Sequence, residues 1–398
     1  MKKIRVPYGM AVHNAEEINA VVRTLKNSTQ MGSNVVNFEK KISNLFDKKY
    51  GLMVNSGSSA LLLAFASLNL PKGSEVITPV LTFATTVASI IQNNLIPAFV
   101  DVKKTTYCIN EDDIEKMISK KTRAICVPNL IGNIPNWKKI RNIAKKYNLI
   151  IIEDSADALG SKIYGRLTGY YSDISISSFY GSHIINCAGN GGIVCFNNEK
   201  YFKKAKLLRS WGRSSSLFKN SESINHRFNT KIDNFYYDSK FIFSEIGFNF
   251  EPSEIGASYG LVQLNKLNQN IKLRKKNFSS HQLFFKKYNK WFELPTQEET
   301  VSTGWLAYPL ILKKNTKISR KQIQIYLEKN NIQTRVVFTG NILKQPGFRR
   351  IMCKKNKTGY PNANNVMQNG FLIAVHHGLN NKMLSHLYNC FEKLLKNK

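Results

Sequence analysis

The chain has 398 residues, of which 42% are hydrophobic and 21% charged, a composition typical of a globular protein. Lysine and arginine total 58 against 26 acidic residues, which gives a formal net charge of +32. The lysines are dispersed in short clusters without a nucleic-acid-binding motif, so we interpret the charge as solvated surface and expect no nucleic-acid partner. No apolar run is long enough to span a membrane and the basic start has no apolar leader, so we expect a cytoplasmic protein without a membrane partner.

Short apolar runs alternate with helix-like stretches over the first part of the chain. Strands are predicted at 51–56, 75–80, 96–102, 123–129 and 149–155, and helices at 58–68, 85–93, 111–119 and 136–147. Continuous apolar strands that alternate with helices indicate a mostly parallel sheet covered on both faces. Ligands of such sheets bind beyond the carboxyl ends of the strands, so we expect the functional site there.

The pattern changes after about residue 265. Residues 303–314 and 332–338 predict strands, and Ser319 with Gln322 predicts a capping box at the start of a helix. An amphipathic helix is predicted at 382–396. We therefore expect an α/β protein with a large domain at 1–265 and a smaller α+β domain at 266–398. The stretch 213–245, rich in Ser, Asn, Lys and Tyr, predicts a long surface excursion.

Polar residues follow two of the predicted strands. Ser58 and Ser59 open a helix, where backbone N–H groups and hydroxyls suit a phosphate, although simple helix capping explains them as well. Asp154 ends a very apolar strand, and a buried carboxylate needs a cationic partner. The protonated ring nitrogen of pyridoxal phosphate (PLP) is such a partner, and a structural ion pair is the alternative.

Two further residues fit the same ligand. Phe83 follows another strand end and can lie over a flat ring, while Ser178 can add a second hydroxyl to the phosphate site. Each residue is ambiguous alone. Together, in this order, they indicate a cofactor site.

The chain resembles the PLP-dependent sugar aminotransferase family, which has the aspartate aminotransferase fold (fold type I). The resemblance rests on "NSGSSALLLA" (55–64), "IIEDSADALG" (151–160) and "GFNFEPSEIGASYGLVQL" (247–264). It implies a large, mostly parallel domain that binds PLP or its amine form, PMP.

Carried over residue by residue, the resemblance also implies a role for each site residue. Ser58, Ser59 and Ser178 would hold the phosphate, Phe83 would stack on the ring, Asp154 would pair with the ring nitrogen, and Asp157 would lie near the ring oxygen. Asn249 would reach the phosphate in the partner subunit, which implies a homodimer with shared active sites.

His183 stands where the family has the lysine that forms the Schiff base. Imidazole cannot form this imine, but it can carry protons near neutral pH, so the cofactor would be bound non-covalently. A branch of the family, the nucleotide-sugar 3-dehydratases, has histidine at this position. "EDSADALG" (153–160) and "TRVVFTGNILKQPGF" (334–348) are also similar to this branch.

The branch has two types. One holds an iron–sulfur cluster through cysteines after a "WGR" segment and works with a reductase; the other has no cluster and regenerates PMP from glutamate. In this chain "WGRSSS" (211–216) has no cysteine, and none occurs from Phe196 to Met352. Because thiolates hold such clusters, we expect the glutamate-dependent type, with no iron–sulfur cluster and no metal site.

The expected activity is C3 dehydration of a nucleotide-linked 4-keto-6-deoxyhexose to a 4-keto-3,6-dideoxyhexose, for 3,6-dideoxysugar and polysaccharide biosynthesis. His183 would be the catalytic acid and base, and Tyr180 and Arg213 would line the substrate site. For Arg213, a surface or dimer ion pair is an equal alternative. Three other functions stay open: a nucleotide-sugar aminotransferase, a 3-dehydrase that needs a separate reductase, and a non-catalytic binder of sugar nucleotides.

Overall fold

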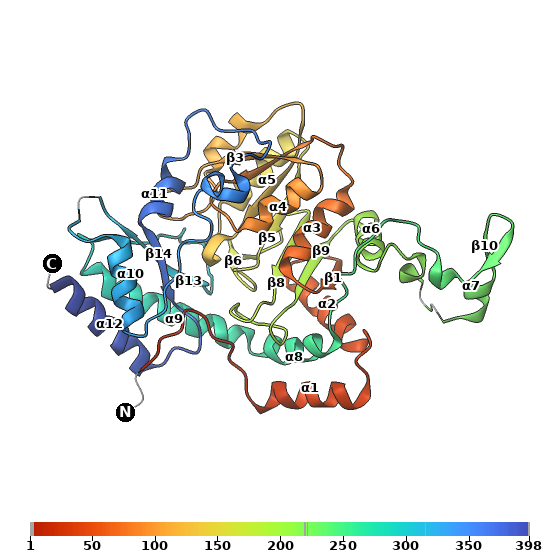
Figure 1. The fold of residues 1–398 in the computed structure, drawn as a ribbon, viewed down its shortest axis with the longest axis horizontal. Coiled ribbons are helices and arrows are strands. Elements are labelled where there is room, and N and C mark those ends of the chain that lie inside the picture. The colour runs from red at the N-terminus through yellow and green to blue at the C-terminus, as the bar shows by residue number, and fades with distance from the viewer. Residues whose placement is uncertain (1–3, 219, 221, 315, 397–398) are drawn as a thin grey trace.

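A seven-stranded sheet forms the centre of the protein, seen in a computed structural model that describes residues 4–218, 220, 222–314 and 316–396. Its strand order is β1-β9-β8-β5-β4-β2-β3 (Figure 1). The strands are β1 (Tyr50–Val54), β2 (Glu75–Pro79), β3 (Ile96–Val100), β4 (Thr122–Pro128), β5 (Ile150–Asp154), β8 (Ile174–Ser178) and β9 (Gly192–Phe196). Only β9 runs antiparallel to its neighbours in this sheet, so the predicted mostly parallel sheet is confirmed.

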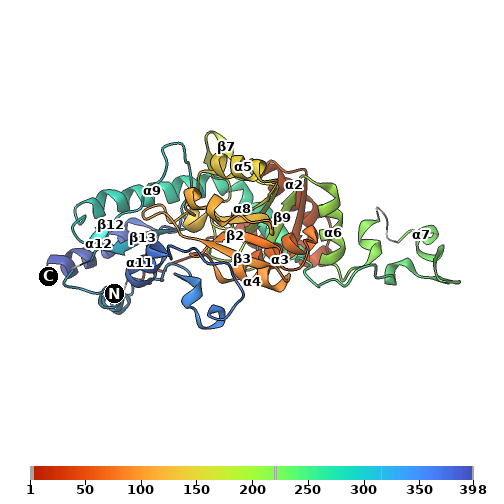
Figure 2. The same ribbon diagram turned by 90° about the horizontal axis from the view of Figure 1, so that it is seen from above.

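Helices cover both faces of this sheet (Figure 2). The helices on one face are α3 (Gly57–Leu68), α4 (Ala84–Gln92) and α6 (Glu199–Arg209); those on the other are α2 (Ser33–Leu45), α5 (Trp137–Lys146) and α8 (Glu254–Asn265). Consecutive strand residues serve opposite faces, because side chains alternate along a strand. Ile152 packs in the core beneath α3, and Ile151 packs in the core beneath α5.

The predicted helix at 111–119 is wrong. Two short 3-10 helices, Glu111–Asp113 and Glu115–Met117, occupy this stretch. Its buried apolar residues, Ile114 and Met117, are three positions apart, which matches the three residues per turn of a 3-10 helix. The short hairpin of β6 (Lys162–Ile163) and β7 (Arg166–Leu167) lies between β5 and β8 in the chain.

The C-terminal part is built on a three-stranded antiparallel sheet of β12 (Phe292–Glu293), β13 (Ala307–Leu312) and β14 (Gly370–Ala374). Its helices are α9 (Leu267–Lys286), α10 (Arg320–Lys329), α11 (Pro361–Asn369) and α12 (Asn381–Lys396). The predicted capping box of Ser319 and Gln322 is confirmed at the start of α10. The predicted domain boundary at 265/266 falls at the junction of α8 and α9, and the division into domains stays a prediction.

The predicted strand at 332–338 is wrong. This segment makes only isolated bridges, from Ile332 to Val6 and from Arg335 to Leu372. The place beside β13 is taken by β14, which pairs with β13 from Ala307 to Ile311. The segment then turns at Phe338, where φ is +44°, and runs back towards the large sheet.

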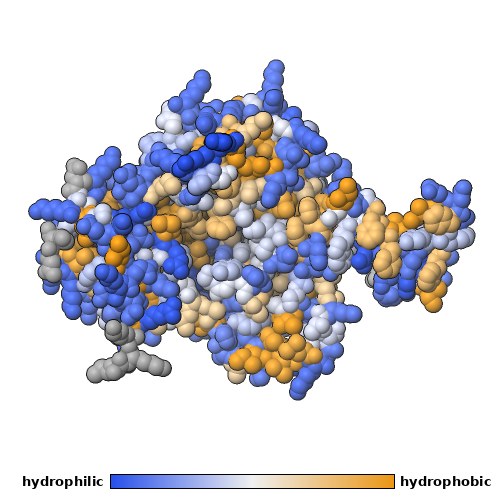
Figure 3. All heavy atoms as spheres, in the orientation of Figure 1, coloured by the Kyte–Doolittle hydropathy of each residue, from blue (hydrophilic) through white to orange (hydrophobic). Residues whose placement is uncertain are grey.

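The surface excursion at 213–245 is confirmed in its described residues. It contains α7 (Ile224–Phe228) and a hairpin of β10 (Thr230–Ile232) and β11 (Phe235–Tyr237), and it projects far from the body (Figure 1). Hydrophobic side chains are exposed along it (Figure 3), among them Phe228, Phe235, Tyr236, Tyr237, Phe241 and Phe243. Near the N-terminus, α1 (Ala15–Asn27) lies against α8. No helix in the described part of the chain is long and apolar enough to cross a lipid bilayer.

Candidate active site

A cavity of about 400 Å³ lies at the carboxyl ends of the parallel strands. The strands β1, β4, β5 and β8 all end at this edge of the sheet, which is where α/β sheets bind ligands. The cavity is lined by predicted site residues: Ser58, Phe83, Asp154, Asp157, Ser178, Tyr180 and His183.

Three predicted site residues do not line this cavity. Ser59 bonds through its hydroxyl to Ser56, which caps α3. Asn249 pairs through its backbone with Ser210, and its proposed contact with a partner subunit stays a prediction. The guanidinium of Arg213 lies 4.6 Å from the ring of Trp211, and its contact with substrate stays a prediction too.

The start of α3 forms an anion site. Ser56 Oγ accepts a hydrogen bond of 3.1 Å from Ser59 N, and Ser58 Oγ donates to Thr85 Oγ1 at 3.0 Å. Gly57 lies so close to Ser178 that a Cβ on it would stand 2.6 Å from the Ser178 Cβ. This brings two serine hydroxyls to a helix N-terminus, which suits a phosphate.

Two carboxyl groups face the cavity beside this anion site. Asp154 accepts a hydrogen bond of 3.1 Å from Ala156 N, and Asp157 accepts one of 2.9 Å from Ile131 N. In the described part of the chain neither forms a salt bridge. Burial raises the pKa of Asp154 to about 6, and burial with the charge of Asp154 raises the pKa of Asp157 to about 7. A cationic ligand would stabilise the ionised form of Asp154, whose charge burial disfavours.

His183 lies in the turn between β8 and β9. Its Nδ1 is 2.7 Å from the carbonyl oxygen of Ala156. A carbonyl only accepts hydrogen bonds, so Nδ1 carries the proton and Nε2 keeps its lone pair for the cavity. Burial and the charge of Arg274 lower the pKa of His183 to about 4, against a raising effect of the Ala156 bond. Near neutral pH the imidazole is therefore an uncharged base.

The backbone holds the His183 turn in place. Gly181 N donates to Gly189 O at 3.0 Å and Cys187 N donates to Phe179 O at 3.1 Å, so the turn folds back on itself. The side chains that follow the histidine, Ile184 and Ile185, are buried in the core against α2 and α8. The imidazole therefore projects from a rigid support.

Aromatic and aliphatic side chains form the mouth of the cavity. Phe83 is 52% exposed, and its ring meets the edge of Phe338 with centroids 6.2 Å apart. Tyr180 meets His183 edge-on at 6.4 Å. Tyr8 and Leu306 complete the wall. A flat ring fits between such side chains.

Sequence reasoning did not assign Tyr8, Leu306 or Phe338 to the site. Phe338 lies within the "TRVVFTGNILKQPGF" stretch, which was a usable signal. No sequence pattern marks Tyr8 or Leu306, because each enters from a segment remote from the sheet and reaches the cavity only through tertiary packing.

The cysteines lie apart from this chemistry. All except the partly buried Cys353 are buried, and Cys126, Cys187 and Cys195 pack in apolar clusters. Over the described ranges, no group of three or more His, Cys, Asp or Glu side chains is arranged to hold a metal ion.

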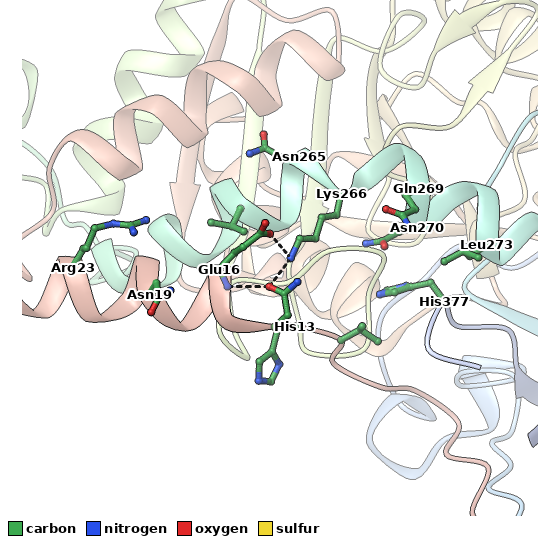
Figure 4. A pocket seen from close by; sticks show the side chains of 13 residues that line it. His13, Glu16, Asn19, Arg23, Asn265, Lys266, Gln269, Asn270, Leu273 and His377 are labelled. Carbon is green, nitrogen blue, oxygen red and sulfur yellow. Dashed lines mark hydrogen bonds and ion pairs between the residues drawn. The ribbon is translucent and has the colours of Figure 1, made fainter. Parts of the chain in front are cut away.

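A larger groove of about 800 Å³ lies between α1 and the junction of α8 and α9 (Figure 4). Its central cation, Lys266, is paired with Glu16 at 2.9 Å and with Glu17 at 2.7 Å. The central charge of the groove is therefore already neutralised by protein. The titratable groups of the candidate site, Asp154, Asp157 and His183, line the smaller cavity.

Comparison with known proteins settles the family. Residues 12–392 match the DegT/DnrJ/EryC1/StrS aminotransferase family. The chain belongs to this family. Its relatives include lipopolysaccharide biosynthesis protein RfbH of Salmonella typhimurium, 34% identical over 89% of this chain and 84% of that protein. GDP-4-keto-6-deoxy-D-mannose 3-dehydratase of Yersinia pseudotuberculosis is 30% identical over 99% of this chain and 100% of that protein.

Solved structures agree with the family match. The E. coli GDP-4-keto-6-deoxy-D-mannose-3-dehydratase with bound hydrated PLP has a TM-score of 0.86 and 26% identity, covering 98% of this chain and 99% of that one. The fold is therefore that of fold type I PLP enzymes, and the family cofactor is PLP or PMP. The residues present fit this cofactor: among the described residues Asp154 has no cationic partner, and the start of α3 offers groups that suit a phosphate.

Proposed function

We propose that the protein is a PLP/PMP-dependent 3-dehydratase of a nucleotide-linked 4-keto-6-deoxyhexose. It removes the C3 hydroxyl to give a 4-keto-3,6-dideoxyhexose, and glutamate regenerates PMP. The observation that carries the proposal is His183, an uncharged base in the cavity with no amine to link to a cofactor aldehyde.

The cavity residues divide the binding of the cofactor between them. The start of α3 with Ser58 and Ser178 would hold the phosphate, and Phe83 would cover one face of the ring. Asp154 would pair with the ring nitrogen and hold it protonated. Asp157, whose pKa is raised to about 7, would share a proton with the ring oxygen. When bound, the cofactor supplies an amine that joins the sugar ketone and a ring that withdraws electrons.

His183 would carry the proton. Because Nδ1 is bonded to Ala156 O, Nε2 is the nitrogen that would accept and return a proton beside the bound cofactor. The pKa of the imidazole is lowered to about 4, so its protonated form gives up a proton more readily than an ordinary imidazolium. It can therefore give the same proton to the departing C3 hydroxyl, which leaves as water. Phe338 and Leu306 exclude solvent water from this exchange.

Relatives support this assignment. GDP-4-keto-6-deoxy-D-mannose 3-dehydratase is named for the proposed reaction, and it matches over nearly the whole chain. The neighbouring structures include a variant of this enzyme, ColD, in which a serine and the histidine after it are replaced by asparagine and lysine. This chain has the same pair in Ser182-His183, with the histidine in the cavity.

We also propose a homodimer with shared sites. Asn249 does not line the cavity of its own chain, which supports a role in the cavity of a partner. The exposed aromatic side chains of the 213–245 excursion also support a contact with a partner subunit. A large exposed hydrophobic surface typically marks a site where another protein binds. Arg213 lies at the root of this excursion, where we propose that it contacts substrate phosphate.

The proposal is tested by following the cofactor and the released ammonia. Purified protein is loaded with PLP and given glutamate, and the aldehyde absorbance is expected to convert to that of PMP. Addition of GDP- or CDP-4-keto-6-deoxyhexose should then release ammonia. The variant H183N should still bind PLP but release ammonia at least ~10²-fold more slowly, since general acid–base catalysis contributes that much. H386N, on α12 outside the cavity, should match the wild type.

Three results would contradict the proposal. A stable amino sugar without ammonia would indicate an aminotransferase. Turnover only with an added reductase would indicate the reductase-dependent type. No spectral change with any amino donor would indicate a non-catalytic binder.

A further inference from the structure

Arg274 on α9 is buried, with 0% of its surface exposed. Its Nη2 donates to the backbone oxygens of Ser182 at 3.3 Å and His183 at 3.2 Å. Its Nη1 donates to the backbone oxygens of Trp305 at 3.1 Å and Leu306 at 3.2 Å. One guanidinium thus joins the histidine turn to the segment before β13, which carries the Leu306 wall of the cavity.

The remaining donor of Arg274 is used as well. Nε donates to Nδ1 of His377 at 3.3 Å. Within the described residues no carboxylate forms a salt bridge with this arginine, so its hydrogen-bond acceptors are all neutral, and the charge of Asp157 acts on it without a direct contact. Burial lowers the pKa of Arg274 to about 10, and the group still carries its charge near neutral pH. Such a charge is costly, and a fold that needed only a tether could use a neutral side chain.

We infer that Arg274 is a positioning residue of the proposed dehydration: its guanidinium fixes the His183 turn against the cavity wall, and its charge adds to the burial that disfavours a charged imidazole. The inference rests on the proposed function for its kinetic part only. Its geometric part stands on the contacts of Arg274 with the two backbone segments.

The charge acts on a crowded set of groups. The titratable side chains that surround His183 and Arg274 come from β5 and the turn after it, the N-terminal segment, the His183 turn and the loop after β14: Asp154, Asp157, Tyr8, Tyr180, His376 and His377. Arg274 lowers the pKa of His183, of His377 and of Asp157. Burial alone would keep His183 neutral, and the arginine adds to this in the same direction.

Two variants separate the tether from the charge, with K276M on the exposed face of α9 as the control. R274M removes both, and R274K keeps a cation that cannot span the two backbone segments. PLP binding, kcat and KM for ammonia release, and the titration of His183 by histidine ¹³C NMR are measured on the PLP-loaded protein. The spectrum of H183N identifies the signal of His183.

R274M is expected to lower kcat by about 10²-fold with little change in KM, because a small displacement of a catalytic group costs that much. Its His183 titration and the acid limb of its rate profile should move to higher pH. R274K should lose kcat similarly while His183 titrates as in the wild type. K276M should change nothing.

The inference is overturned if R274M keeps the wild-type kcat and the wild-type titration of His183. If R274M does not fold, R274K decides, and a wild-type kcat in R274K overturns the tether. If the wild type releases no ammonia, the proposed function is wrong. The titration of His183 in the variants still tests the effect of Arg274 on the imidazole.

Discussion

Burial shifts the proton equilibria of His183 and Asp154 in opposite senses. It lowers the pKa of the imidazole to about 4 and raises that of the carboxyl to about 6, so each is pushed towards its neutral form. The consequences differ near neutral pH. The histidine gains a free lone pair, while the aspartate still ionises and holds a buried negative charge that no cation among the described residues pairs with. A protonated ring nitrogen relieves this charge, so Asp154 ties protein stability to cofactor binding.

The variant D154N tests this coupling. A carboxyl whose pKa is raised on folding stabilises the native state below its unfolded pKa of about 4, and that stability is lost as pH rises through about 6. The ionised carboxylate therefore costs the cofactor-free protein at most about 3 kcal/mol at mildly alkaline pH. D154N removes this cost, so without PLP it should unfold at an equal or higher temperature than the wild type at pH above about 7. PLP should raise its Tm far less than it raises that of the wild type.

A lower Tm of cofactor-free D154N at alkaline pH would contradict this account. So would an unchanged stabilisation of the variant by PLP. Thermal scans of both proteins, with and without PLP, give the answer.

Three elements crowd together where the cofactor phosphate would bind: the start of α3, the end of β8 and the start of β9. A Cβ on Gly192 would lie 2.2 Å from the backbone of Ser56, and one on Gly57 would lie 2.6 Å from Ser178. The glycines therefore set how near the start of α3 approaches Ser178 at the end of β8. This closeness brings Ser58 and Ser178 to one anion.

The variant G192A tests the crowding. The added methyl must displace the backbone at the start of α3, so we expect a loss of about 1–3 kcal/mol in the free energy of unfolding. The affinity for PLP should also fall, because the Ser56–Ser58 turn moves. G347A is the control, since no atom lies within 4 Å of its added Cβ. Equal denaturant midpoints and equal PLP affinity for G192A and the wild type would contradict the interpretation.

The local sequence pattern predicts the elements that are determined by nearby residues, and it fails for elements that depend on pairing with distant strands. The buried strands β1 to β5 and the capping box at Ser319 follow from apolar runs and side-chain chemistry that act over a few residues. The segment 332–338 has an equally apolar run, but β13 pairs with β14, and pairing is decided by the whole fold. Arg274 shows the same limit: Lys272, Lys275 and Lys276 stand near it in the sequence, and nothing local tells that among these cations it alone is buried.

The whole molecule has a surface that a single chain leaves uncovered. The 213–245 excursion exposes Phe235, Tyr236 and Phe241, and Asn249 lies outside the cavity of its own chain. The family resemblance places Asn249 at the phosphate of a partner, so the proposed dimer has two sites, each built from both chains. Motifs pointed to cavity residues such as Asp154 and His183, whereas no motif pointed to Tyr8 or Leu306.

Mixed dimers test the shared site. H183N and N249A should each be nearly inactive alone, since each damages both sites of its own dimer. After subunit exchange, a hybrid dimer has one intact site, so about a quarter of the wild-type activity should return. A mixture no more active than its parts, with exchange confirmed by mass, would contradict the shared site.

We propose that His183 makes an aminotransferase-like site catalyse dehydration of the sugar. The mass of the sugar product distinguishes dehydration from transamination. Wild-type protein is incubated with PLP, glutamate and GDP-4-keto-6-deoxymannose, and the masses of the nucleotide sugars are measured by mass spectrometry. Dehydration followed by release of ammonia exchanges the C3 hydroxyl for hydrogen, so the account predicts a product about 16 Da lighter than the substrate. Transamination replaces the keto oxygen by an amine and a hydrogen, and a product about 1 Da heavier would contradict the account.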